Sequence, residues 1–212
     1  MRRDALNFFD GTLYINLPQR TDRRKKIKAE LQKAALDPNK IFRIEASYDE
    51  LNGIRGCVLS HIKALDFAIE KGWKNVLILE DDCLFLKNQN KMDSYINHFL
   101  VHFKNEWDVF FLGGEIHLSE KTDHAEYVKV QFSLRAHAYA VNGDYLCKLR
   151  DHFVSTYEST KEDLFFTQSL HKALDRRWAE LQLKDRWYAG LKPIARQSKS
   201  FSDIEKGIKP CR

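Results

Sequence analysis

Three consecutive carboxylates, Glu80, Asp81 and Asp82, follow directly on an apolar run in the stretch 75–85, which reads NVLILEDDCLF. Adjacent carboxylates repel one another, and partial burial raises the cost of that repulsion. A divalent cation would remove the cost, because magnesium and manganese prefer carboxylate oxygens and commonly share their shell with substrate phosphates. The triplet therefore predicts a cation site. The alternative is that all three acids point into solvent at the end of a strand.

The apolar residues before the triplet indicate which element positions it. A continuous apolar run is typical of a strand buried on both faces of a parallel sheet. Open parallel sheets bind ligands at the carboxyl ends of their strands. Successive side chains of an extended chain point to opposite faces. We therefore expect Glu80 and Asp82 on one face and Asp81 on the other, so that one cation contacts two of the three.

The rest of the chain alternates between strand and helix patterns. Val58, Ile62, Leu65 and Ile69 form a helical stripe, and Gly72 is placed to end that helix. This alternation predicts one α/β domain. Strands are expected at 11–17, 41–46, 75–80, 107–114, 124–132 and 135–143, and further helices at 21–36, around 92–103, at 143–153 and at 161–174.

The composition and charge of the chain indicate which kinds of molecule the protein is expected to bind. The 212 residues are 43% hydrophobic and carry a net charge of only +5, and without an RNA-recognition motif, a zinc finger or a dense basic run we expect no nucleic-acid partner. No apolar run approaches the ~20 residues of a membrane helix. The start of the chain has no apolar signal segment, so we expect a cytoplasmic protein, with peripheral docking at an anionic membrane left open. The four scattered cysteines show no zinc spacing and indicate reduced thiols.

Several segments together resemble glycosyltransferase family 25. The resemblance rests on LYINLPQRTDRRKKI, GIRGCVLSHIKAL and NVLILEDD, in that order, and on the later segments WDVFFLGG, RAHAYAVNGDYLCKL, KEDLFFTQSL and PIARQSKSFSDIE. It implies a GT-A fold, which is a Rossmann-like, mostly parallel sheet flanked by helices, in a single domain over 1–212. Residues 11–112 would form the nucleotide-sugar-binding half, and residues 113–206 the acceptor-binding half with a C-terminal lid.

The resemblance also implies an activity. The family transfers a hexose, galactose or glucose, from a UDP-sugar to a hydroxyl of a glycan or of hydroxylysine, with inversion and with Mn²⁺ (or Mg²⁺). The collagen enzymes of the family have a histidine- and glycine-rich sequence before the closing motif, where this chain has ARQSK. That departure leaves a collagen-type acceptor open to question. The alternatives are a non-catalytic nucleotide- or carbohydrate-binding module on the same fold, and a flavodoxin-like phosphate-binding or phosphotransfer protein.

Roles for single residues follow from the same resemblance. Asp82 is the expected metal ligand, Glu80 is a second ligand or a nucleotide contact, and Asp81 contacts the ribose or the sugar. Asp163 is the expected general base, with Glu162 as the neighbouring alternative. An acid at a helix start, favourable to the helix dipole, is the plainer explanation for Asp163. The residues expected to bind the donor are Leu17, Arg20, Arg24, Gly56, Ser60, His61, Asp81, Gly113, Gln197, Ser202 and Asp203.

Other polar residues have simpler explanations. Apart from Arg24, the RRKK stretch that contains Arg23 is expected to be a solvated helix face. His61 is either a donor contact or a partly buried helix residue, and His137 and Tyr139 are expected to pack in the core. For Asp203, the alternative to a contact with the donor is a role as a ligand of the metal ion.

Overall fold

The computed structural model describes residues 5–104, 106–165, 167–198, 200–202 and 207–209. Its centre is a six-stranded sheet with the order β2-β1-β3-β6-β5-β7. β1 pairs in parallel with β2 and β3, and β5 pairs in parallel with β7, whereas β6 runs antiparallel to β3 and β5. Five of the six strands therefore run in one direction, and the expected α/β fold with a mostly parallel sheet is confirmed.

The elements have the following bounds. The strands are β1 Gly11–Asn16, β2 Ile41–Glu45, β3 Asn75–Glu80, β4 Cys83–Phe85, β5 Val109–Lys121, β6 Tyr127–Asn142, β7 Trp187–Gly190, β8 Ala195–Gln197, β9 Ser200–Ser202 and β10 Gly207–Lys209. The α-helices are α1 Thr21–Lys33, α2 Gly53–Glu70, α3 Gln89–Phe103, α4 Gly143–Ser159, α5 Leu174–Arg177 and α6 Ala179–Gln182. The 3₁₀ helices are η1 Ala5–Phe8, η2 Pro38–Lys40 and η3 Leu170–Lys172.

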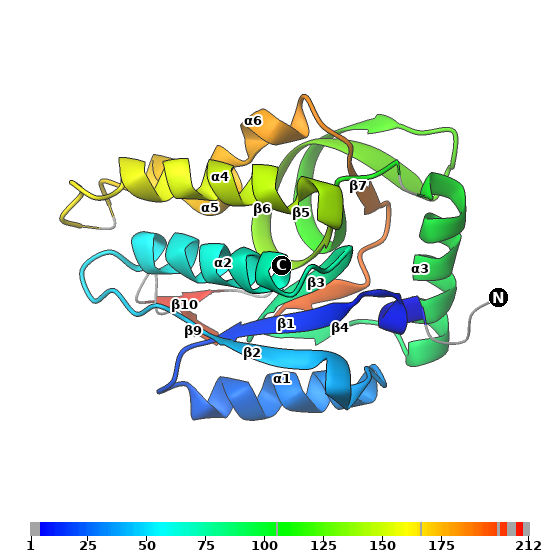
Figure 1. Ribbon diagram of the computed structural model, residues 1–212, viewed down its shortest axis with the longest axis horizontal. Helices are drawn as coiled ribbons and strands as arrows, with labels where there is room; N and C mark the ends of the chain where they lie inside the picture. The colour runs from blue at the N-terminus through cyan, green and yellow to red at the C-terminus, as the bar shows by residue number, and fades with distance from the viewer. Residues whose placement is uncertain (1–4, 105, 166, 199, 203–206, 210–212) are drawn as a thin grey trace.

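Helices cover both faces of the sheet (Figure 1). The period of two along the strands produces this division, since alternate residues point to opposite faces. Leu13 and Ile78 join one buried cluster with residues of α2 and α4, while Tyr14 and Leu79 join another with residues of α1 and α3. The sheet is therefore buried on both sides, as the apolar run before the carboxylates predicts.

The boundaries differ from expectation in two places. The two strands expected at 124–132 and 135–143 are one long strand, β6. The helix expected at 161–174 is wrong, because residues 161–165 and 167–169 form turns and irregular loop that lead into η3. Polar side chains there bond to one another and to the backbone, as in the contact from Phe165 N to Gln168 Oε1, at 3.0 Å, and such bonds compete with a helix. Gly72 does end α2, with a φ of 65°.

No helix in the described part of the chain is both long and apolar enough to cross a membrane.

Candidate functional site

The carboxylate triplet lies at the carboxyl ends of the parallel strands. The register pairs Ile15 of β1 with Glu80 of β3, and Asp81 and Asp82 form the turn between β3 and β4. The helices α1 and α2 begin at the same end of the sheet, because each follows a parallel strand, β1 or β2. This is the edge at which open α/β sheets bind ligands.

Asp81 is buried and held by two partners. Its side chain accepts hydrogen bonds from Nδ2 of Asn16, at 2.7 Å, and from Nη1 of Arg23, at 2.8 Å. Burial raises the pKa of Asp81, and the charge of Arg23 and the bond from Asn16 oppose that rise. Asn16 is itself fixed by Arg43, whose Nε donates to its Oδ1 at 3.1 Å. Asp81 is therefore part of a closed polar network beneath the site.

Arg23 also reaches the last acid of the triplet. Its Nη1 lies 3.8 Å from Oδ2 of Asp82, and only 12% of each side chain is exposed. The expectation of a solvated helix face is wrong for Arg23, because α1 begins beside the turn that carries these acids. Asp81 and Asp82 share this arginine, so the face alternation expected for the triplet does not hold. The physical reason is that the extended strand ends at Glu80.

Glu80 points toward a different set of partners. Its Oε1 lies 3.4 Å from Nε2 of His61, and its Oε2 accepts from Nε2 of Gln197 at 3.2 Å. His61 is buried, and its Nδ1 lies 2.8 Å from the hydroxyl of Tyr139. The structure thus brings together two of the expected donor-binding residues, His61 and Gln197, around Glu80.

Two further charged residues, Arg135 and Glu115, form a connected set of contacts next to Gln197. Nη1 of Arg135 donates to Oε1 of Gln197, and Nε of Arg135 donates to Oε2 of Glu115, at 2.9 Å. Arg135 has a φ of 73°, a strained conformation for a residue with a side chain. β5 is irregular in the same region, with register shifts on both sides of Gly113. Sequence reasoning assigned no role to Arg135 or Glu115, and the positive φ has no sequence signature.

His137 is buried next to this network, as expected for a residue of the core. It is 3% exposed, and burial lowers its pKa to about 4, with the charge of Glu80 opposing that shift. Gly113 lies against it, since a Cβ at Gly113 would come within 2.4 Å of both His137 Nε2 and the carbonyl of Ala195. Gly113 is therefore required by the close approach of β6 and β8 to β5.

Two expected donor-binding residues of α2 have structural partners. The hydroxyl of Ser60 donates to the carbonyl of Gly56 at 2.7 Å and accepts from the backbone N–H of Ser47 at 2.9 Å. A Cβ at Gly56 would lie 2.6 Å from the carbonyl of Ser47. Both residues thus fasten the loop after β2 to the first turn of α2.

The remaining expected residues near β1 lie at the start of α1. Leu17 is half-buried, and its carbonyl accepts from the N–H of Arg20 at 3.0 Å. Nε of Arg20 lies 3.0 Å from Oδ1 of Asp22, and this contact lowers the pKa of Asp22 to about 2. Arg24 is exposed. Arg20 therefore orients Asp22.

Asp163 lies outside these networks, in the loop before η3. Its carboxylate accepts from the hydroxyl of Ser169 at 2.6 Å and from Nζ of Lys172 at 2.9 Å. These partners lower its pKa. Its backbone carbonyl contacts Nη1 of Arg55 at 3.3 Å, which joins the loop to the beginning of α2. Its neighbour Glu162 is exposed.

The closing segment crosses the carboxylate turn. β8 pairs antiparallel with β4, with Cys83 opposite Gln197, and the N–H of Ser198 donates to the carbonyl of Asp82 at 2.7 Å. Ser202 ends β9, and its side chain lies outside the described part. Asp203 also lies outside the described residues.

Among the described residues, the side chains of Cys57, His61 and Glu80 form a group whose possible metal-ligand atoms all lie within 4.8 Å of one another. Glu80 and Asp82, the two expected metal ligands, supply hard carboxylate oxygens and contact different partners, Gln197 and Arg23. Sequence reasoning missed Cys57, although the spacing from Cys57 to His61 places both on one face of a helix.

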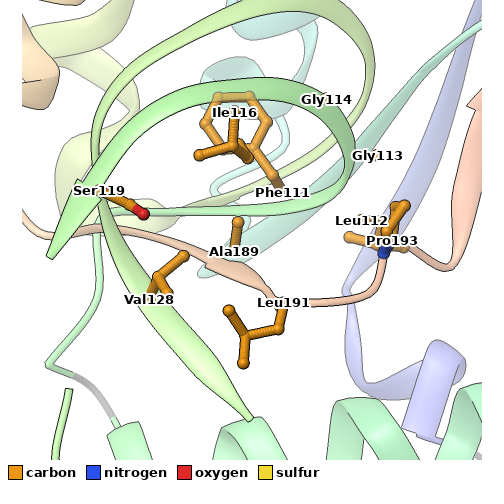
Figure 2. Close-up of a pocket in the computed structure, with 11 residues that line it drawn as sticks. Phe111, Leu112, Gly113, Gly114, Ile116, Ser119, Val128, Ala189, Leu191 and Pro193 are labelled. Atoms are coloured by element: carbon orange, nitrogen blue, oxygen red, sulfur yellow. The ribbon is translucent and has the colours of Figure 1, made fainter. Parts of the chain in front are cut away.

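A cavity of about 330 Å³ adjoins Gly113. Figure 2 shows Phe111 and Ile116 within the bend of β5, with Ala189 on the neighbouring β7. The other lining residues are Leu112, Gly113, Gly114, Ser119, Val128, Gly190, Leu191 and Pro193. Apart from Ser119, the lining residues have apolar side chains or none, and Gly113 also lies against His137.

No protein-family model matches the sequence, and no curated protein matches it. Solved structures do match in fold. A mannose-1-phosphate geranyltransferase from Thermus thermophilus is 10% identical, with a TM-score of 0.52, over 86% of this chain and 73% of that chain. A197 from STIV is 12% identical, with a TM-score of 0.48, over 93% and 92% of the two chains.

A glycosyltransferase involved in the glycosylation of the major capsid of PBCV-1 is also 12% identical, with a TM-score of 0.45, over 92% of this chain and 95% of that chain. At such identities the likeness concerns the fold alone. The chain therefore has a Rossmann-like α/β fold of the kind found in the Thermus transferase. Membership of glycosyltransferase family 25 stays a prediction.

Proposed function

We propose that this chain is an inverting, metal-dependent glycosyltransferase that moves galactose or glucose from a UDP-sugar to a hydroxyl of a glycan or hydroxylysine. The observation that carries the proposal is the convergence at the end of β3. Oδ2 of Asp82 lies there 3.8 Å from Nη1 of Arg23, and Glu80 accepts a hydrogen bond from Gln197. Carboxylates for a cation next to side chains that can bind phosphate or sugar oxygens are what a nucleotide-sugar donor requires.

Asp82 and Glu80 offer the carboxylate oxygens that a hard divalent cation prefers, and a bound cation would draw the two side chains together. Asp81 is already bound by Asn16 and Arg23, so the two ligands we assign are Asp82 and Glu80. Both side chains retain some exposure, 12% and 21%. Bound Mn²⁺ or Mg²⁺ would supply Lewis-acid neutralisation of the charge that develops on the leaving diphosphate.

The protein's own side chains would position the carboxylates of the site and the donor. Gln197 and His61 fix the direction of the Glu80 carboxylate, and Arg23 fixes Asp81 for contact with the ribose or the sugar. We keep Leu17, Arg20, Arg24, Gly56, Ser60, Gly113, Ser202 and Asp203 as donor-binding residues of the proposal. Gly56, Ser60 and Gly113 would act through the backbone they bring close together.

Inversion is a single displacement and needs one general base, which we assign to Asp163. Ser169 and Lys172 lower its pKa, so that the carboxylate is ionised at neutral pH but less basic. In this assignment the acceptor hydroxyl gives its proton to Asp163 as its oxygen attacks the anomeric carbon.

A non-catalytic nucleotide- or carbohydrate-binding module is the alternative that one observation favours. Asp163 is tied to Lys172 and Ser169, and a base must be able to reach the acceptor hydroxyl. A module with this fold would bind UDP-sugars and would not transfer the sugar. The acceptor, membrane docking and cytoplasmic location stay predictions.

The test of the proposal is thermal unfolding with UDP, in the presence and absence of Mn²⁺. A ligand at 100 times its Kd adds about 2.7 kcal/mol to the free energy of unfolding, so UDP with Mn²⁺ should raise Tm by several degrees in the wild type. The gain from Mn²⁺ should vanish in Asp82→Asn and persist in the exposed-site control Asp123→Asn. Absence of any UDP effect, with or without Mn²⁺, would contradict the proposal, whereas a Mn²⁺ effect without a UDP effect would favour a phosphotransfer protein.

A further inference from the structure

Cys57, His61 and Glu80 form a group that the proposed donor site does not use as a unit. Cys57 and His61 lie four residues apart on α2, so they occupy the same face of the helix. Glu80 reaches them from the end of β3, with its Oε1 3.4 Å from Nε2 of His61. The three ligand atoms lie within 4.8 Å of one another. A small closing movement would bring all three onto one ion.

The chemistry of this group differs from that of the carboxylate pair. A thiolate and an imidazole are softer ligands than carboxylates, and zinc accepts sulfur, nitrogen and oxygen in a tetrahedral site. Magnesium and manganese prefer oxygen ligands. The group from α2 and β3 therefore favours zinc over the cations expected for Asp82 and Glu80.

Tyr139 supplies the outer partner that such a histidine requires. Its hydroxyl lies 2.8 Å from Nδ1 of His61 and can either donate or accept a hydrogen bond. When Tyr139 donates, Nε2 of His61 carries the proton and faces the Glu80 carboxylate. When Nδ1 donates to Tyr139 instead, the lone pair of Nε2 is available to a metal, and outer partners of this kind orient metal-binding histidines.

We propose that Cys57, His61 and Glu80 form a zinc site with an open fourth position, which lies beside the proposed donor-cation site and shares Glu80 with it. Glu80 cannot direct the same oxygens to both ions, because its Oε1 faces His61 and its Oε2 is bonded to Gln197. Zinc at this site would then weaken the binding of Mn²⁺ with UDP. This last consequence, unlike zinc binding itself, rests on the proposed function.

Zinc binding is tested without any nucleotide. The full chain, freed of metal by dialysis against a chelator, is titrated with zinc in competition with a chromophoric chelator. We expect one tight site in the wild type and in Cys147→Ser, the matched control, because Cys147 is exposed on α4. Tyr139→Phe should weaken zinc binding about tenfold or more, the typical effect of losing an outer partner, and Cys57→Ser should weaken it further. Equal zinc affinity in wild type and Cys57→Ser would overturn the proposal.

Cobalt binding gives a second test of the site. It is made on the wild-type protein and does not depend on whether a variant folds. Co²⁺ bound by the wild type should show the near-ultraviolet charge-transfer band of a cobalt–thiolate bond, and Cys147→Ser should show it too. A cobalt spectrum without that band would refute a site that contains Cys57. Mn²⁺ with UDP should reduce the zinc affinity, and an unchanged affinity would refute the sharing of Glu80. A protein that binds zinc as described but shows no UDP effect on Tm would lose only the proposed transferase function.

Discussion

Gln197 donates from Nε2 to Oε2 of Glu80 at 3.2 Å, across 117 residues of sequence. This contact fastens the segment that closes the domain to the carboxyl end of β3. It is reinforced by the pairing of β8 with β4 and by Arg135, which binds the other end of the Gln197 amide. The orientation of Glu80 is thus set by β8, a strand late in the sequence that falls within the predicted acceptor-binding half, 113–206.

Loss of this contact should weaken cation and donor binding together. A hydrogen bond to a charged group contributes roughly 1.5–3 kcal/mol, and Glu80 is partly exposed, so we expect the smaller value to apply. Gln197→Ala should therefore weaken Mn²⁺-dependent UDP binding about tenfold in calorimetric titration. Lys192→Ala, at an exposed position of the same segment, should bind as the wild type does. Unchanged affinity in Gln197→Ala would mean that Glu80 is positioned without Gln197.

The assignment of Asp163 as base predicts a loss of rate without a loss of binding. Asp163→Asn keeps the size of the side chain and removes its ability to take a proton. The rate of transfer should fall by about a hundredfold or more, within the usual contribution of a general base, while UDP affinity stays within twofold or so of the wild type. Glu162→Gln is the matched control and should keep the wild-type rate. Equal losses of rate and UDP affinity would contradict the role of Asp163 as base.

Arg23 stabilises the fold by pairing with a buried acid. Removing one partner of a buried ion pair typically costs about 3–5 kcal/mol, because the other charge stays buried without compensation. Asn16 still bonds to Asp81, so Arg23→Met should lower the free energy of unfolding by about 3 kcal/mol in urea titration. Lys25→Met, at an exposed position of α1, should have little effect. The double variant with Asp81→Asn should regain part of the loss, and strict additivity of the two changes would refute the pairing.

Gly113 and Gly114 form a matched pair for a test of packing. A Cβ at Gly113 would meet backbone and imidazole atoms at 2.4 Å, whereas at Gly114 the nearest atom lies at 3.4 Å. Overpacking of this kind typically costs about 1–3 kcal/mol. Gly113→Ala should therefore lower Tm by several degrees and Gly114→Ala by much less. Equal effects would indicate that β8 can move away from β5.

The sequence predicts the α/β alternation and the place of the carboxylates, because both depend on local patterns. The apolar run of β3 indicates a strand buried on both faces, and the acids that follow it must then lie at a ligand-binding edge. Gly72 likewise ends α2 for a local reason, its positive φ. These features need no knowledge of how distant segments meet.

The partners of those acids were not predictable in the same way. Arg23 lies in a run of basic residues that resembles a solvated helix face, and only the placement of α1 beside the β3–β4 turn brings it to Asp81. Gln197 reaches Glu80 through the pairing of β8 with β4. Cys57 becomes a possible ligand because α2 packs beside the end of β3. Each contact is set by tertiary packing, which periodicity along the chain does not contain.

His137 should make stability fall on mild acidification. Burial lowers its pKa from 6.5 to about 4, so between these values the unfolded chain binds a proton that the folded protein does not. The free energy of unfolding should therefore decrease by about 3 kcal/mol as the pH falls from about 6.5 to about 4, at roughly 1.4 kcal/mol per pH unit. His137→Asn should remove most of this slope in urea titrations at a series of pH values. His152, whose pKa burial also lowers, accounts for a remaining slope, while His117→Gln, at an exposed site, should keep the wild-type slope. A slope in His137→Asn as steep as in the wild type would show that His137 is protonated in the folded protein.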